Sequence, residues 1–113
     1  MNSQTKKINK IDNEMLETHL GRVGTRPELK YVKDEKLAIC KFRFAVDNGK
    51  KNDPDWISVV AFSDLAEIID SEINKGDQLF LRGKALVRTW VDSEGSEKLS
   101  REFRVNKVAS VLK

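Results

Sequence analysis

Basic and aromatic residues alternate along residues 77–91 of this 113-residue chain. Successive side chains of a β-strand point to opposite faces, so every second residue shares one face. One face of this segment would carry Phe80, Arg82, Lys84, Leu86, Arg88 and Trp90. Aromatic rings can stack on planar bases, and Lys and Arg can pair with phosphates. The pattern therefore predicts a surface suited to a single-stranded nucleic acid.

A second segment, residues 55–62, shows the same division into two faces. Ile57, Val59 and Ala61 form an aliphatic set that suits a protein interior. The opposite face carries Trp56, Ser58, Val60 and Phe62. Ordinary core packing does not explain two large aromatic side chains on that face, so Trp56 and Phe62 become candidates for base stacking, together with Trp90.

The segment 37–47 supplies further basic residues. Its expected inward set is Ala38, Cys40, Phe42, Phe44 and Val46, and Lys41 and Arg43 point outward. The candidate phosphate-binding residues on these strands are Lys41, Arg43, Lys84 and Arg88. Each aromatic candidate could equally pack against a loop, a helix or a second subunit. For Phe80 we favour such a packing or interface role.

The elements that must position these residues are mostly strands. Strands are expected near 14–24, 37–47, 55–62, 77–91 and 101–112, with turns at residues 47–49 and 93–96. One helix is expected after residue 62: Ser63 or Asp64 would cap it, with Glu67 completing a capping box, and Gly76 would end it. Its apolar positions are Leu65, Ile68, Ile69 and Ile73. This order predicts an all-β, five-stranded OB-fold Greek-key barrel with one α-helix between strands 3 and 4.

Length and composition limit the other possibilities. The chain suffices for one domain, here residues 13–113, preceded by a flexible basic arm at residues 1–12. The net charge of +3 permits nucleic-acid binding without requiring it.

One cysteine, Cys40, and one histidine, His19, exclude an intramolecular disulfide and an ordinary zinc site, and no cofactor is expected. Cys40 is expected to pack as a small apolar residue, and His19 to be a surface or interface residue. No signal peptide or membrane-spanning stretch is evident, so a cytoplasmic, nucleoid-associated protein is expected.

Four sequence blocks resemble the bacterial and phage single-stranded DNA-binding proteins. They are LGRVGTRPELKY (20–31), KFRFAVDN (41–48), DWISVVAFSDLAE (55–67) and KGDQLFLRGKALVRTWVDSEG (75–95). In the first block, the resemblance implies that Gly21, Gly24 and Pro27 shape the turn after the first strand. It also implies a non-catalytic OB-fold that coats single-stranded DNA in replication, recombination and repair, as a homotetramer in preference to a dimer. The family's stacking aromatics match Trp56, Phe62 and Trp90, and its basic position before the last tryptophan matches Arg88.

The sequence departs from that family's pattern at several places. The loop after residue 47 lacks a stacking tryptophan and carries Lys50 and Lys51, whose charge is expected to substitute in part. Ser58 stands where the family often has a basic residue. The N-terminal strand is more polar than usual in the family, with Glu14, Glu17 and His19, which weakens the expectation of a tetramer.

The C-terminus is a further departure. The sequence ends at Lys113, without the linker and acidic tip by which family members recruit other replication proteins. A trimmed domain and a tail-less plasmid, phage or mobile-element relative both fit this observation.

Other functions stay open at this point. One is a primosomal or replication-restart accessory protein of the same fold, usually dimeric; another is an OB-fold adaptor that binds a polypeptide. RNA could bind in place of DNA, since stacking and phosphate contacts tolerate both. An enzyme is not expected, because Asp47, Asp53 and Asp55 have no partner carboxylate placed to complete a metal-dependent nuclease site.

Overall fold

The computed structural model describes residues 16–49 and 53–111, which form a barrel of antiparallel and parallel strands. Five strands close the ring, and each is hydrogen-bonded to the next in the order β1, β5, β6, β4, β3 and back to β1. Their bounds are β1 Glu17–Val23, β3 Leu37–Val46, β4 Asp55–Phe62, β5 Gln78–Val91 and β6 Glu97–Ser110. The predicted OB-fold is confirmed, with the helix α2 (Ser63–Glu72) following β4. The predicted arm at residues 1–12 lies outside the described residues.

A sixth strand, β2 (Glu28–Val32), was not predicted. Among the described strands it pairs with β3 alone, from Glu28 opposite Lys41 to Val32 opposite Leu37, and it adds an edge to the barrel without entering the ring. Five residues at a sheet edge carry too weak an alternation to predict a strand. Gly21, which the resemblance implied would shape the turn after the first strand, lies inside β1, and β1 approaches β3 too closely there for a side chain. The last strand begins at Glu97, four residues before its predicted start.

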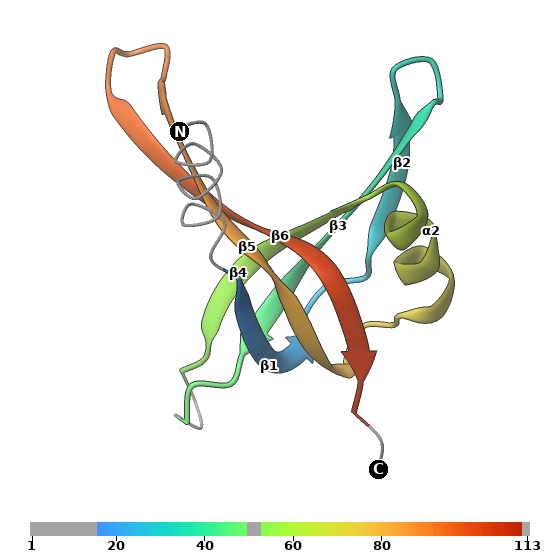
Figure 1. Cartoon of the computed structure of the whole chain (residues 1–113). Coiled ribbons are helices and arrows are strands. Elements are labelled where there is room, and N and C mark those ends of the chain that lie inside the picture. Colours follow the sequence, from blue (N-terminus) through green and yellow to red (C-terminus); the bar gives the residue numbers. More distant parts are fainter. Residues whose placement is uncertain (1–15, 50–52, 112–113) are drawn as a thin grey trace, which may run out of the picture.

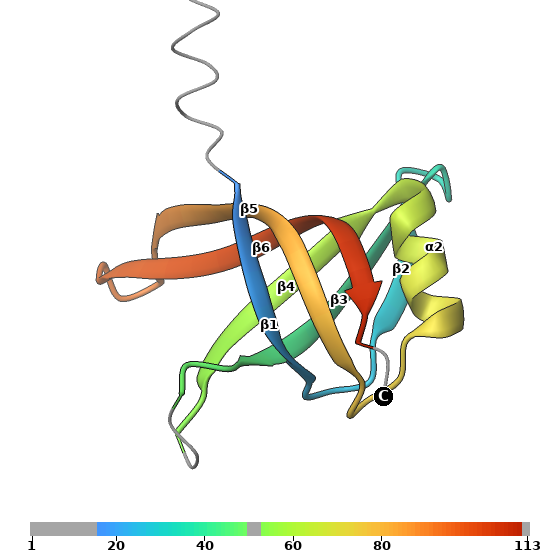
Figure 2. The ribbon, with the colours of Figure 1, turned by 60° about the horizontal axis from the view of Figure 1, so that its bottom comes forward.

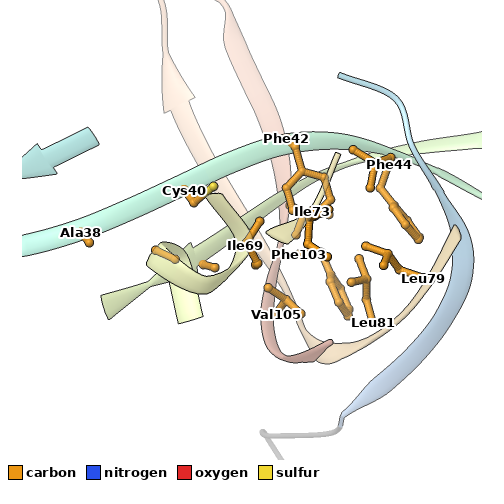
Figure 3. Packing of buried hydrophobic residues seen from close by; sticks show 14 residues of the cluster. Ala38, Cys40, Phe42, Phe44, Ile69, Ile73, Leu79, Leu81, Phe103 and Val105 are labelled. Carbon is orange, nitrogen blue, oxygen red and sulfur yellow. The ribbon is translucent and has the colours of Figure 1, made fainter. Parts of the chain in front are cut away.

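The barrel interior holds one cluster of apolar side chains from all five ring strands and α2 (Figure 3). The predicted inward residues of β3 are confirmed, from Ala38 to Phe44, with Val46 partly buried beside them. Cys40 is fully buried, as expected, and burial raises the pKa of its thiol to about 11, with a smaller effect from Asp70. The core therefore contains a thiol that stays protonated at neutral pH.

The helix differs from its prediction at both ends. Phe62 occupies the N-cap without any side-chain hydrogen bond, and Ser63 has a positive φ of 59° because the chain turns directly from β4 into the helix. The predicted capping box is therefore wrong. The Glu67 carboxylate instead accepts a hydrogen bond of 2.7 Å from the Tyr31 hydroxyl on β2, which raises the pKa of Tyr31. The helix ends at Glu72 with Ile73 as its C-cap, before Gly76.

One apolar face of α2 packs on the barrel. Ala66, Ile69 and Ile73 are buried in the core, and Leu65 packs against it. Ile68, predicted with this apolar set, is instead half exposed, because it lies on the side of the helix that faces away from the barrel. The helix thus covers the barrel with a narrower apolar stripe than the sequence indicated.

Two hairpins extend away from the barrel (Figure 1). The β2–β3 hairpin rises beside α2, and the β5–β6 hairpin extends in a different direction, away from the helix (Figure 2). We call the outer part of the β5–β6 hairpin, residues 86–101, the arm. Its turn forms as predicted: Asp92 Oδ1 accepts hydrogen bonds from the Glu94 and Ser96 amides, and Gly95 has a φ of 84°. The arm places part of both long strands beyond the barrel core.

Candidate nucleic-acid interface

Trp56 lies at the start of β4 on the outer face of the barrel, with 49% of its surface exposed. Its ring lies against Gly24, where a Cβ atom would collide with the ring. The Arg43 guanidinium carbon is 5.8 Å from the centroid of the same ring. Gly24 is in turn held to Arg43, because its amide donates to the Arg43 carbonyl at 2.7 Å. A large aromatic surface is therefore fixed in orientation while half of it faces solvent.

Gly24, which directly follows β1, has a role beyond the turn that the resemblance implied. Its lack of a side chain provides the space for the Trp56 ring. Thr25 supports the same region, since its hydroxyl accepts a hydrogen bond of 2.9 Å from the Arg43 amide.

Ser58 also belongs to this part of the face. It lies opposite Arg43 in the β3–β4 ladder, and an Arg43 guanidinium nitrogen is 3.4 Å from its hydroxyl oxygen. The neighbouring strand therefore places a cation beside the position where the family often has a basic residue.

Three cations line up across the strands near the middle of this face. Lys41 on β3 is in register with Val60 on β4, Val60 with Arg104 on β6, and Arg104 with Lys84 on β5. We call Lys41, Arg104 and Lys84 the basic row; at ordinary strand spacing it extends over about 14 Å. Val60 is buried although it belongs to the outer face, which agrees with aliphatic stems of long basic side chains covering it.

The basic row places two like charges in neighbouring positions on β5 and β6. Lys84 and Arg104 are directly opposite one another, and like charges at such positions destabilise a sheet. Glu28 lies opposite Lys41 and offsets part of the charge at the other end. An anion bound between Lys84 and Arg104 would relieve their repulsion.

Phe62, at the end of β4, is covered more than Trp56 is. The guanidinium carbon of Arg104 lies 4.5 Å from the Phe62 ring centroid. On that side of the ring, a base can stack on Phe62 after displacing Arg104, or it can stack on the guanidinium plane itself. Phe62 and Trp56 lie six residues apart on β4, each paired with an arginine from a neighbouring strand.

Trp90 lies on the arm, away from the other two aromatic candidates. It is half exposed and in register with Lys98 on β6. Arg88 is in register with Ser100 on the same ladder. The structure therefore groups Trp56, Phe62, Lys41, Arg43 and Lys84 on the barrel, and carries Trp90 and Arg88 on an extension of the same sheet. Lys50 and Lys51 lie outside the described residues.

Open space adjoins this face on two sides. A cleft of about 600 Å³ opens where β4 and β6 separate, and residues of both strands line it, including Trp56, Ile57, Arg101 and Phe103. His19 also lines this cleft; its ring meets Phe103 edge-on at 5.1 Å and its Nε2 is 3.0 Å from a Glu17 carboxylate oxygen. A shallower groove of about 350 Å³ joins Arg26 to Lys41 and Arg43.

Two cations of this surface, Arg104 and Arg26, were not predicted. Arg104 could have been found, because the residues on either side of it, Phe103 and Val105, are buried and the alternation places Arg104 outward. Arg26 could not, because it reaches the groove from the segment between β1 and β2, and only the packing of that segment brings it near Arg43. Among the described residues, no cluster of three or more potential metal ligands occurs, and no helix is long and apolar enough to cross a membrane.

Comparison with known proteins identifies relatives of this chain. The single-strand binding protein family matches residues 15–111. The single-stranded DNA-binding protein of Bacteroides thetaiotaomicron is 33% identical over 96 residues, covering 77% of this chain and 59% of the relative. Single-stranded DNA-binding protein 1 of Xylella fastidiosa is 29% identical over 91 residues, covering 74% and 67% respectively. The chain thus spans roughly 60% to two thirds of the length of these relatives.

A solved structure shares the fold. The crystal structure of a small single-stranded DNA-binding protein from Streptomyces coelicolor superposes with a TM-score of 0.73 at 23% sequence identity, over 88% of this chain and 96% of that one. The family match covers nearly all of the described residues and every strand of the barrel. The chain therefore belongs to the single-strand binding protein family, whose members bind single-stranded DNA.

Proposed function

We propose that this domain coats single-stranded DNA without marked sequence preference, in replication, recombination and repair. Bases would stack on Trp56, Phe62 and Trp90, and phosphates would pair with Lys41, Arg43, Lys84 and Arg88, with Lys50 and Lys51 from the adjoining loop. No catalytic step is assigned to the domain, and its place of action would be the cytoplasmic DNA.

The observation that carries this proposal is the pairing of an immobilised, half-exposed tryptophan with the basic row. The Trp56 side chain should lose little conformational entropy on binding, because Gly24 and Arg43 already hold its ring in place. Base stacking on an aromatic side chain contributes about 1–3 kcal/mol per base. A phosphate between Lys84 and Arg104 would attract both cations and so offset the repulsion between them.

The outer face of β1, β5 and β6 supports self-association. Phe80 is exposed there beside a groove of about 370 Å³, which Thr18, Arg82, Lys107 and Ala109 also line. Phe80 is in register with Leu20 on β1 and with Ala109 on β6, so this exposed aromatic has aliphatic and small neighbours on both sides. Such surroundings fit a subunit contact, with Arg82 and Lys107 at its rim. We propose that copies of the domain associate through this barrel exterior, as a tetramer in preference to a dimer.

Tryptophan fluorescence during titration with oligo-dT, at low and at high salt, tests the DNA proposal. Strong quenching that weakens with salt is the expected result, since both tryptophans belong to the proposed site. Wild-type affinity in a folded Trp56→Ala/Trp90→Ala variant would refute the stacking assignment. A monomer mass in sedimentation at micromolar concentration would refute the self-association.

A further inference from the structure

The arm has two faces, and only one of them carries Trp90. The other, which we call the inner arm face, continues the face that forms the barrel core. It is built from three cross-strand pairs: Val87 with Arg101, Thr89 with Leu99, and Val91 with Glu97. In the next pair toward the barrel, Phe103 is buried in the core, whereas Ala85 opposite it is still exposed.

Apolar exposure is concentrated on the inner arm face. Val91, Val87 and Leu99 are 63%, 60% and 56% exposed, more than any other large hydrophobic side chain that the structure describes. They are adjacent on two paired strands and form one patch. Contiguous exposed apolar surface usually marks a contact site.

Two opposite charges flank this patch at equal distances from Leu99. Glu97 and Arg101 lie on β6, two residues before and two residues after Leu99, and therefore about 14 Å apart with Leu99 midway. Neither side chain has a hydrogen bond or ion pair within the described part of the chain. One end of the patch is thus negative and the other positive.

We propose that the inner arm face packs against the same face of a second copy of this chain. A twofold axis would run across the strands at the level of Thr89 and Leu99, so that the two β6 strands lie antiparallel. Glu97 then faces Arg101 of the second copy, and Arg101 faces its Glu97. Val91 faces Val87 of the second copy, and Leu99 faces Leu99. The contact is isologous, because one patch supplies both sides of it.

The charge pattern selects this arrangement over the other twofold possibility. An axis parallel to the strands would bring Glu97 onto Val91 and Arg101 onto Val87, which would bury both charges against apolar side chains. The antiparallel arrangement pairs both charges and covers all three apolar side chains.

This contact uses none of the residues proposed to bind DNA, although Arg101 also lines the cleft beside Trp56, and it does not involve Phe80. Trp90 and Lys98 lie on the opposite face of the arm and stay accessible when two arms pack. The proposal does not rest on DNA binding, and it would link two barrels, or two assemblies of barrels, through their arms.

Charge reversal tests the pairing. Glu97→Arg would set two arginines against each other at both ends of the contact, and Arg101→Glu would do the same with glutamates. We expect each variant to weaken arm-dependent association by about tenfold or more in sedimentation at low salt. The double variant Glu97→Arg/Arg101→Glu restores the pairing with inverted signs, and we expect association close to that of the wild type. Glu94→Arg, at the turn and off this face, makes the same charge change as a control and should leave association unchanged.

Cross-linking tests the geometry independently. Thr89 lies at the axis, so Thr89→Cys in two copies would lie face to face across the ~10 Å that separates stacked sheets. We expect a short bis-maleimide to join two Thr89→Cys chains, and not two Lys98→Cys chains, which carry the thiol on the opposite face. The native chain is the negative control and should not be cross-linked, because its cysteine, Cys40, is buried.

Failure of the double variant to restore association, or equal cross-linking at both introduced thiols, would overturn the proposal. Titration of the same variants with a short oligo-dT distinguishes failure of the arm contact from failure of the proposed DNA binding. Glu97→Arg is expected to bind the oligonucleotide at least as tightly as the wild type whether or not the arms pack.

Discussion

The two halves of β5 follow the same alternation of faces but differ in how deeply the corresponding side chains are buried. In the barrel half, Leu79 and Leu81 are fully buried, whereas Val87 and Val91, on the same face of the arm half, are largely exposed. The difference arises because α2 and the other strands of the ring enclose the first half, while β6 is the only described element that pairs with the second half. Periodicity therefore determines which face a side chain is on, and the surrounding elements determine whether that face is buried.

This difference also separates stability from recognition. The barrel provides the core that stabilises the fold, and the arm adds surface on which both faces can meet a ligand or another copy. Substitutions on the same face of β5 should therefore change stability in the barrel half, and binding or association in the arm half.

The largest effect is expected for truncation inside the barrel. Leu81→Ala should lower the free energy of unfolding by about 3 kcal/mol, because it leaves a cavity in a closed core. Leu99→Ala, on the arm, should change it by less than about 0.5 kcal/mol, since its side chain is already exposed. Urea denaturation of dilute protein measures both, and equal losses would contradict the division between barrel and arm.

The next effect concerns the two tryptophans. Trp56→Ala should reduce affinity for oligo-dT by about 2 kcal/mol and Trp90→Ala by about 1 kcal/mol, because Gly24 and Arg43 hold only Trp56 in advance. Titration by anisotropy with a labelled oligonucleotide compares them. Gly24→Ala sharpens the test: it should reproduce much of the Trp56→Ala loss while Trp56 is still present. A larger loss for Trp90→Ala would place the main stacking site on the arm.

A smaller effect is expected from the turns that end the two hairpins. The β2–β3 turn holds Lys33, Asp34 and Glu35 at φ of 57°, 58° and 66°, conformations that non-glycine residues adopt at a cost. Glu35→Gly should therefore raise the free energy of unfolding by about 0.5–1 kcal/mol. Gly95→Ala in the β5–β6 turn, where φ is 84°, should lower it by about 1 kcal/mol. Thermal unfolding of the two variants checks both signs, and a destabilised Glu35→Gly would mean that the turn is not strained.

The smallest effect is expected for single cations. Arg104→Gln should reduce the slope of log affinity against log salt by about 0.7, the contribution of one phosphate contact on a single strand. Lys75→Gln, a cation outside the basic row, should leave the slope unchanged. An unchanged slope for Arg104→Gln would restrict Arg104 to its contact with Phe62.

Much of the fold could be predicted because it depends on local pattern. Alternation identified the inward residues of β3 and β4 and the outward positions of Lys41, Arg43 and Trp56, and these are confirmed. The helix caps were wrong, since Ser63 adopts a conformation that the β4–α2 junction imposes and Glu67 bonds to a distant strand. The strand β2 was missed because five residues at an edge carry too little signal.

The residues that surround the site depended on register. Nothing in the local sequence indicates that Arg104 will stand opposite Lys84 and beside Phe62, because residues of three strands meet there. Nor does it show that Gly24 makes room for Trp56, since the two lie 32 positions apart in the chain.

The sequence by itself determined which side chains share a strand face, because alternation is a property of the extended backbone alone. Only the tertiary structure decided which of those faces are enclosed, which cations are brought into one row, and which glycine lies beneath a tryptophan. Those outcomes depend on strand register and on where the barrel ends, and both are set by contacts between segments far apart in the chain.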